Sequence, residues 1–456
     1  MIIPKTYRTV IAVVISLVLY LYFAYFLQRE NYIELSSLYV LLFIPFLYFL
    51  KFEKQNLQFL IGITILFRLI FLFAIPNLSQ DFYRFIWDGR MILEGFNPYI
   101  SLPETFIQER NFPVSQAVDL YDGMGQLNGS HFTNYPPINQ LNFLMAAFFS
   151  NSSILGAVIV MRIQIILADI GIIYFGKKIL DKLNLPIHHI FLYALNPFII
   201  IELTGNLHFE SVMLFFLIWS LFLLLQKKWI WAALVLGLSV SVKLIPLLFI
   251  PLFFQWFVFN QEKEVRSKKK GFLKLLMFAS IVILTNIILF LPFISSELIN
   301  SYTDSIGLWF RNFEFNASLY YVAREIGYLF RGYNEIAVIG SIMPMIAILF
   351  LIVITFFRKN KSPQEMITVL LLGISFYYFT TTTMHPWYLA TLVLLSVFTK
   401  YRFTLIWSLT IILSYQAYAN DPWKENLWFV GIEYLLVVVF LIWEIRKINK
   451  QSLLIR

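Results

Sequence analysis

The 456-residue sequence contains no cysteine and little charge. Without cysteine the chain forms no disulfide, no thiol nucleophile and no thiolate metal site. Asp, Glu, Lys and Arg make up only 13% of the residues, whereas 59% are hydrophobic and 18% aromatic. A soluble globular domain carries about 25% charged residues. The composition therefore excludes a soluble globule and indicates a protein that crosses a membrane many times.

Several functional motifs are also missing. The sequence has no G-x-x-x-x-G-K, no H-E-x-x-H and no Rossmann glycine pattern, so nucleotide hydrolysis, zinc proteolysis and dinucleotide chemistry lack support. Its basic residues are scattered over short loops, so we expect no nucleic-acid partner. We also expect no cofactor and no metal. The residues that could in principle hold a metal do not have the local spacing of a metal site: His131, His208, Glu210 and His385.

Long apolar runs predict an all-α, polytopic transmembrane fold, because a barrel would show short alternating segments instead. We expect about fourteen crossings, with twelve as the lower bound. They are expected at 8–27, 35–50, 57–76, 152–176, 187–204, 209–226, 229–242, 243–259, 271–294, 338–357, 364–383, 386–398, 402–418 and 427–445. Several are too short for straight helices across a ~30 Å core, so we expect broken or re-entrant helices around Lys243 and His385.

The basic residues predict the orientation. Most of the 35 Lys and Arg residues lie in short segments on one side of the alternating spans, together with the N-terminus, and the positive-inside rule makes that side cytoplasmic. Two long segments, 77–151 and 295–337, then face outward as loops. We expect one transmembrane domain over 1–456, in the cytoplasmic membrane and surrounded by its lipids. Its first apolar run lacks a small-residue cleavage site and is expected to be an uncleaved anchor.

The segment DFYRFIWDGRMILEGFNPY, residues 81–99, places charge at the mouth of an expected span, where charge is costly. Residues 80–94 are predicted to be helical, with Gly95 as the C-terminal stop. Asp81, Arg84 and Asp88 are spaced i, i+3, i+7 and share one helix face. This pattern fits a surface helix with an internal ion pair, and it also fits a reaction site at a membrane surface.

The span followed by D-x-Y-R-x-x-W-D-G-R and N-P-Y resembles the first outer loop of bacterial polyprenyl-phosphomannose-dependent mannosyltransferases. These are integral membrane glycosyltransferases of the GT-C superfamily, similar to family 87. The likeness runs in order from 81 to 388 and covers most of the chain. Its further landmarks are Tyr135-Pro136-Pro137, Asn196-Pro197 with GNLHFES, SVKLIP, FEFNASLYY at 313–321 and HPWY at 385–388.

The resemblance implies a metal-independent, inverting transfer of a hexose, with mannose the expected sugar. The donor would be a polyprenyl-phosphate sugar and the acceptor a glycolipid or glycan, on the outer face of the membrane. Asp81 occupies the position of the family's general base, which takes the proton of the acceptor hydroxyl. Asp88 is the alternative base, or a substrate contact, or the partner of Arg84.

A lipid-phosphate leaving group needs positive charge or hydrogen-bond donors. His385 resembles the family's phosphate-contacting His, and the alternative is an interfacial His hydrogen-bonded beside its aromatic neighbours. Lys243 is either a phosphate ligand or a snorkelling lysine. Arg311, in FRNFEFN, is a weaker phosphate or sugar contact. The other expected substrate-binding residues are Arg84, Asp88, Arg90, Tyr135, His208, Glu210, Asn316, Trp387 and Tyr388.

Several polar residues also have a structural interpretation. Asn206 could cap the helix after it, and Glu210 would then favour the helix dipole. Arg162 and Asp169 share a face of the fourth span, and Glu202 lies near the end of the next. We predict that these three form interhelical pairs.

Two other functions share parts of this pattern. A transporter or flippase of lipid-linked glycans would place substrate groups near the bilayer midplane and would show two matching halves. The halves of this chain do not match, and its acidic residues cluster outside the expected spans. An O-antigen-type polymerase or ligase shares the topology but is not expected to carry the 81–99 signature.

Overall fold

The computed structural model describes residues 4–259, 267–311, 313–420 and 422–454. These residues are folded as helices and connecting segments, and their one isolated β-bridge joins Phe315 to Thr383. The predicted all-α class is therefore confirmed.

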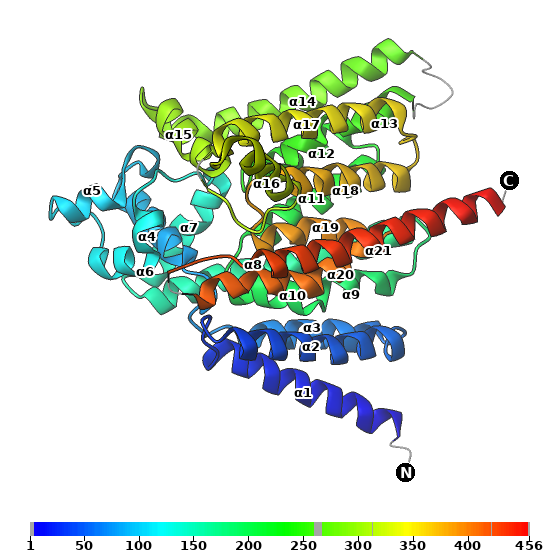
Figure 1. Cartoon of the computed structure of the whole chain (residues 1–456), viewed down its shortest axis with the longest axis horizontal. Coiled ribbons are helices and arrows are strands. Elements are labelled where there is room, and N and C mark those ends of the chain that lie inside the picture. The colour runs from blue at the N-terminus through cyan, green and yellow to red at the C-terminus, as the bar shows by residue number, and fades with distance from the viewer. Residues whose placement is uncertain (1–3, 260–266, 312, 421, 455–456) are drawn as a thin grey trace.

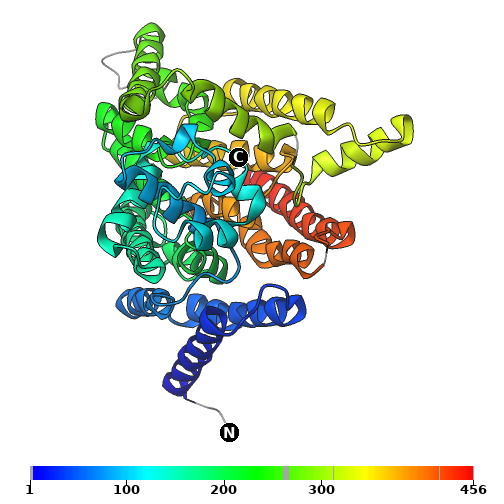
Figure 2. The same ribbon diagram turned by 90° about the vertical axis from the view of Figure 1, so that its left-hand side faces the viewer.

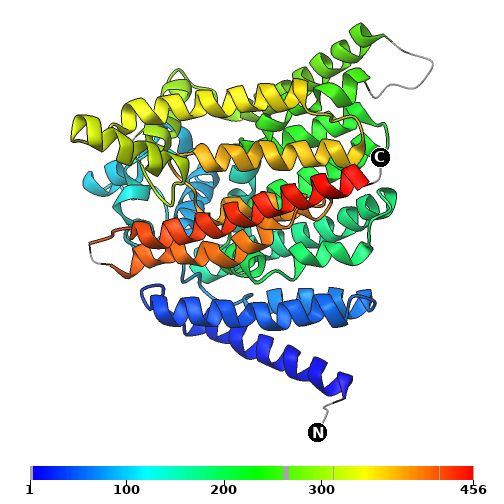
Figure 3. The same cartoon turned by 45° about the vertical axis from the view of Figure 1, so that its right-hand side comes forward.

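Six helices of the described residues are long and apolar enough to cross a membrane. They are α1 (Lys5–Tyr25), α2 (Tyr32–Phe52), α8 (Ile154–Lys182), α14 (Lys268–Phe290), α17 (Ile336–Phe357) and α21 (Leu427–Leu454). Shorter helices in the same bundle are α3 (Leu57–Ile70), α11 (Glu210–Leu225), α12 (Trp229–Val240) and α18 (Pro363–Thr380). Most of them run along the long axis of the molecule (Figure 1, Figure 3). This arrangement is that of a multi-pass membrane protein.

The remaining expected crossings are interrupted helices. The run at 187–204 consists of two helical pieces bent by 50° at a break. The break falls at Pro197, which has no N–H to donate, and the Asn196 side chain accepts from the N–H of Phe198 instead. The first piece consists of η2 (Ile187–Ile190) and α9 (Phe191–Ala194), and the second of α10 (Pro197–Ile199) and η3 (Ile200–Gly205).

The expected breaks near Lys243 and His385 are also present. Lys243 lies between the end of α12 and η4, and His385 directly precedes η7, so each residue lies in a short non-helical connection. The broken segments are η4 (Ile245–Phe249), η5 (Pro251–Phe253), α13 (Phe254–Phe259), η7 (Pro386–Leu389), α19 (Ala390–Ser396), α20 (Phe403–Thr410) and η8 (Ile411–Ala419).

Both long segments between spans fold at the same end of the bundle (Figure 1, Figure 2). The first contains α4 (Asp81–Leu93), η1 (Pro98–Ile100), α5 (Pro103–Gln108), α6 (Ala117–Gly129) and α7 (Pro137–Ser150). The second follows η6 (Leu291–Phe293) and contains α15 (Leu298–Arg311) and α16 (Leu319–Arg331). The hydroxyls of Tyr302 and Ser305 donate to the carbonyls of Asn134 and Phe132, at 3.1 and 2.6 Å, so the two segments form one cap.

Close packing fixes α4 on α7. A Cβ atom at Gly89 would lie 2.2 Å from the carbonyl oxygen of Phe143, so only glycine permits this approach. One turn earlier, the rings of Phe85 and Phe143 stack with their centroids 4.6 Å apart. The W-D-G-R part of the motif therefore serves the packing of α4, which fixes the position of its first residue, Asp81.

Candidate active site

Asp81 is the first residue of α4 and is half-buried. Its carboxylate accepts a hydrogen bond from the Asn128 side-chain amide, 3.3 Å away. Burial raises the pKa of Asp81 above its usual range, while the charge of Lys243, the Asn128 hydrogen bond and the charge of Arg29 oppose that rise. A carboxylate with a raised pKa is a better proton acceptor at neutral pH than an exposed one.

A buried arginine fixes the chain on both sides of this site. The guanidinium of Arg162 donates to the carbonyls of Leu72 and Ala74, which precede Asp81, at 3.1 and 2.7 Å. It also donates to the carbonyls of Thr204 and Gly205, which precede His208, each at 2.9 Å. One side chain on α8 therefore sets the distance between two connecting segments of the site.

The expected structural contacts between helices are present, and the structure supplies the partners that the sequence did not name. Asp169 pairs with Arg68 of α3 at 2.7 Å, because Arg68 faces α8 inside the bundle. Arg162 binds the four carbonyls instead. Glu202 accepts from the hydroxyl of Tyr415 at 2.6 Å and from the Asn206 amide at 3.3 Å. Asn206 is therefore a partner of Glu202, and the expectation that it caps α11 is wrong.

The charged residues that follow Asp81 in its motif are bonded within the protein. Asp88 is fully buried and accepts from Arg84 Nε at 2.8 Å and from Gln140 Nε2 at 3.0 Å. Arg84 also donates to the carbonyls of Asn128 and His131. Arg84 thus holds the end of α6, which supplies Asn128 to Asp81.

Arg90 has the same kind of role further along α4. It is buried and donates to the carbonyl of Ser115 and to the side chain of Gln116 at 3.3 Å. Its bonds, like those of Arg84 and Asp88, are to protein groups. The expectation that the three residues contact substrate stays a prediction, and their bonds also fit a supporting role.

Two histidines stack on the two faces of one tryptophan. The rings of His208 and Trp387 are 3.8 Å apart at 18°, and those of His385 and Trp387 are 4.5 Å apart at 4°. The ring of Phe315 stacks on His385 at 5.4 Å. Because both faces of Trp387 are covered, it holds the imidazoles parallel and leaves no face for a sugar ring. Burial and the charge of Lys243 lower the pKa of His385 to about 3, so its imidazole is neutral at pH 7.

Lys243 forms an ion pair with Glu210 at the start of α11 and lies 5.8 Å from the ring centroid of Tyr388. Its charge acts on Asp81, His208 and His385 alike. The ammonium is thus fixed by Glu210 near the ring of Tyr388, and whether it binds phosphate stays a prediction.

Tyr135 belongs to the same group. Burial raises the pKa of the Tyr135 hydroxyl well above its usual range, and the negative charge of Asp81 adds to the rise. Its ring packs edge-on against Phe85 at 5.0 Å, which fixes it beside α4. The candidates that the structure brings together are therefore Asp81, Tyr135, His208, Glu210, Lys243, His385, Trp387 and Tyr388.

The FEFN segment is bonded to the residues that directly precede His385. The N–H of Phe315 donates to the carbonyl of Thr382 at 3.1 Å, and the N–H of Met384 donates to the carbonyl of Phe315 at 2.8 Å. Asn316 is fully buried; its N–H donates to Glu425 at 2.7 Å and its amide to Glu433 at 3.2 Å. Asn316 is therefore an anchor for this segment. The side chain of Arg311 lies outside the described residues.

Three residues near Asp81 were missed from the sequence: Arg29, Asn128 and Tyr418. Arg29 lies in the short turn between α1 and α2. Of the three residues, it is the one whose position in the sequence is unusual. A basic residue in an expected outer turn departs from the positive-inside pattern. Asn128 and Tyr418 carry no such signal.

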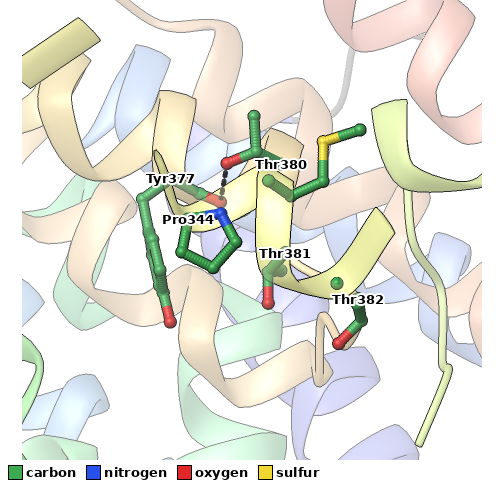
Figure 4. Close-up of a pocket in the computed structure, with 7 residues that line it drawn as sticks. Pro344, Tyr377, Thr380, Thr381 and Thr382 are labelled. Carbon is green, nitrogen blue, oxygen red and sulfur yellow. Dashed lines mark hydrogen bonds between the residues drawn. The ribbon is translucent and has the colours of Figure 1, made fainter. Parts of the chain in front are cut away.

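Two further features were checked against the candidate residues: grouped metal ligands, and a small pocket between α17 and α18. Among the described residues, no three His, Asp or Glu side chains are grouped so that they could hold a metal ion. The pocket between α17 and α18 is lined by Pro344, Tyr377 and Thr380–Thr382, among others (Figure 4). Its volume of about 10 Å³ accommodates roughly one water, so it is too small for a sugar.

Comparison with known proteins gives two findings. The model of the MptA/B family, described as "Alpha-(1->6)-mannopyranosyltransferase, N-terminal domain", matches residues 9–260, more than half of the chain. A relative from Corynebacterium glutamicum, "Alpha-(1->6)-mannopyranosyltransferase A", is 24% identical over 210 residues. That alignment covers 44% of this chain and 39% of the relative, so the chain matches well under half of the relative's length.

Proposed function

Because this chain belongs to the alpha-(1->6)-mannopyranosyltransferase family, we propose that it transfers mannose from a polyprenyl-phosphate donor to a glycolipid or glycan hydroxyl. The reaction would occur at the outer face of the cytoplasmic membrane. One observation carries the proposal: Asp81 begins α4, whose Phe85 packs edge-on against Phe209 at 5.8 Å, and Phe209 directly precedes Glu210, the ion-pair partner of Lys243. This arrangement supplies a base and phosphate ligands in one place.

In the proposed reaction Asp81 takes the proton of the acceptor hydroxyl as its oxygen bonds to the anomeric carbon of the sugar. The bond from that carbon to the phosphate oxygen breaks in the same step, and the polyprenyl phosphate leaves with the electron pair. Such a single displacement inverts the anomeric configuration, so an α-linked product requires a β-linked donor. Asn128 would orient the carboxylate through its hydrogen bond of 3.3 Å.

Lys243 and His385 would bind the leaving phosphate. An ammonium group has three N–H donors, so the one that serves Glu210 leaves two for phosphate oxygens. His385 is neutral and would donate one ring N–H, with its orientation set by Trp387 and Phe315. Positive charge and aligned donors at this point stabilise the charge that develops on the leaving group.

The other candidates would have less direct roles. Tyr135, His208 and Tyr388 adjoin the base and the phosphate ligands and are proposed to contact the sugar or the acceptor. Glu210 would fix Lys243, and Trp387 would align the histidines. The proposed supporting residues are Arg84, Asp88, Arg90 and Asn316.

An apolar groove supports the lipid part of the proposal. It lies between α12, η4 and α14 and is lined by Leu244, Ile287 and Phe290, among others. Its volume is about 300 Å³, and Leu244 is the residue next to Lys243 along the chain. A polyprenyl chain in this groove would place its phosphate at the ammonium group.

The test uses the full-length protein reconstituted in liposomes. Synthetic polyprenyl-phosphate β-mannose should yield an α-linked mannoside on an alkyl mannoside acceptor, and the α-anomer of the donor should yield none. A nucleotide-sugar donor serves as the negative control. Failure to transfer mannose from either polyprenyl-phosphate anomer would refute the proposal, and transfer from the α-anomer would refute the inverting mechanism.

A further inference from the structure

Helix α16, in the second cap segment, exposes an apolar face. Its large apolar side chains recur at i, i+3, i+7, i+10 and i+11, so they form one stripe along the helix. The members of this apolar stripe are all exposed: Leu319, Val322, Ile326, Leu329 and Phe330. Leu329 is 84% exposed and Phe330 82%. A contiguous apolar patch of this kind marks a contact with a protein partner or with a membrane.

The opposite side of α16 is held by the protein. Arg324 pairs with Glu314, which precedes the helix in the FEFN segment. The hydroxyl of Tyr321 donates to Glu425, and Glu425 also accepts from the N–H of Asn316 at 2.7 Å. Because these bonds fix the orientation of the helix, its apolar stripe points away from the bundle in a fixed direction.

The position of α16 along the chain favours a membrane as the partner. The helix ends at Gly332, where φ is 76°, and the span α17 begins at Ile336. Residues 332–335 reach at most about 14 Å when fully extended, so α16 lies close to the level at which α17 enters the membrane. With its 13 residues α16 is about 20 Å long. It is therefore too short to cross a ~30 Å core.

The surface beside α16 is the lipid-facing surface of the spans. The helix packs against α17, whose exposed side chains include Val338, Ile342 and Met345. Near the starts of α2 and α21, Ile33 and Trp428 are 81% and 82% exposed, as much as the end of the stripe. These two spans and α17 all begin at the end of the bundle that bears the cap (Figure 1). The apolar stripe thus adjoins the surface that the spans present to lipid at this end.

We propose that α16 is an interfacial helix, whose apolar stripe inserts between the lipids of the leaflet on the cap side. Such a helix lies along the bilayer surface with its apolar face about 5–10 Å deep, at the boundary of head groups and acyl chains. Arg324 and Arg331 are seven residues apart and lie on the other side of the helix. The partner is the bilayer itself, so the proposal does not depend on the proposed sugar transfer.

The lipid contact would also bear on the site. Asn316, which shares Glu425 with α16, directly follows Phe315, and the Phe315 ring stacks on His385 at 5.4 Å. A helix anchored in the leaflet would therefore hold the FEFN segment at a constant depth beside His385.

The absence of cysteine permits a test by single-cysteine labelling of the full-length protein. Leu329→Cys and Phe330→Cys are each labelled with bimane and reconstituted in phosphatidylcholine liposomes. Lipids that carry a nitroxide near the head-group end of the acyl chain should quench both labels roughly threefold or more as strongly as aqueous iodide does. Lipids with the nitroxide at the far end of the chain should quench them less, because the stripe is shallow.

Arg331→Cys is the matched control, because it lies on the same helix but away from the stripe. Its label should be quenched less by nitroxide lipids than the label of Leu329→Cys. Gln108→Cys, exposed at the end of α5, marks water and should respond to iodide alone. Leu349→Cys, exposed on α17, marks the acyl region and should respond most to the nitroxide at the far end of the chain. Thermal unfolding in detergent checks that each variant is folded.

Iodide quenching of the Leu329→Cys and Phe330→Cys labels at the level of Gln108→Cys would place the stripe in water and overturn the proposal. Labels shielded from both quenchers would overturn it as well, since a second copy or another protein would then cover the stripe. Neither result bears on the proposed function, which the transfer assay tests separately.

Discussion

Replacing Asp81 with Asn tests the assignment of the base most directly, because the structure predicts a large loss of activity with little change in fold. The substitution exchanges one carboxylate oxygen for an amide NH₂ and keeps the oxygen that accepts from Asn128. Loss of the negative charge in the first turn of α4 costs about 0.3–1 kcal/mol of helix stability. Relief of a desolvated charge offsets this cost. The free energy of unfolding should therefore change by about 1 kcal/mol at most.

The effect on catalysis should be much larger. General base catalysis contributes roughly 10²–10⁴-fold to a rate, so Asp81→Asn should lower kcat by that factor. The corresponding rise in the barrier is about 2.7–5.5 kcal/mol. Donor binding should persist, because Lys243 and His385 are unchanged.

The assay measures transfer of radiolabelled mannose from polyprenyl-phosphate β-mannose at saturating acceptor, with thermal unfolding in detergent as the measure of fold. Asp119→Asn is the matched control: Asp119 is an exposed acid in the first turn of α6, in the same cap, so its loss of charge and dipole interaction is similar. It should retain wild-type activity.

Asp88→Asn separates the two carboxylates of the motif. It breaks a buried ion pair with Arg84, which costs about 3–5 kcal/mol of stability. Activity per folded molecule should survive better than in Asp81→Asn. Retention of more than about a tenth of wild-type kcat by Asp81→Asn would refute the assignment of the base, as would a fully folded but inactive Asp88→Asn with an active Asp81→Asn.

Three further predictions concern pH, phosphate binding and stability. Burial raises the pKa of Asp81, so kcat/KM should fall as the pH drops through a value above the ordinary ~3.9 of an aspartic acid, and a pH profile that is flat down to pH 4 would contradict this. His385→Ala should raise the donor KM roughly tenfold by removing one phosphate donor, with little effect on the acceptor KM; initial rates at varied donor and acceptor test the split. Arg162→Met should lower the free energy of unfolding by about 3 kcal/mol or more, because four carbonyls, three of them in buried hydrogen bonds, lose their donor, and an unchanged melting temperature in detergent would rule this out.

Hydropathy and motif order predicted much of the fold. Each expected crossing contains at least one helix, and the helix expected at 80–94 runs from Asp81 to Leu93. The breaks around Lys243 and His385 were predictable because those runs are too short to span and carry Pro246 and Pro386. These are local properties of the chain, since helix period, span length and proline effects depend on neighbours a few residues away.

Side-chain partners were not predictable in the same way. Arg162 and Asp169 share a helix face, which predicted bonds to other helices but not their partners: Asp169 bonds to Arg68, and Arg162 to carbonyls before Asp81 and His208. Spacing along one helix says which residues share a face but not which helix that face meets.

The sequence by itself determined that this is a helical membrane protein, that its unusual polar residues lie between the spans, and that Asp81 begins a helix at such a junction. Only the tertiary structure decided that Trp387 is covered on both faces by histidines and that Asp88 is fully bonded inside the cap. It alone brought Arg29, between the first two helices, onto the ring of Tyr418 near the other end of the chain. The reason is physical: hydropathy is set by neighbouring residues, whereas a site assembled from several connecting segments depends on how the helices between them pack.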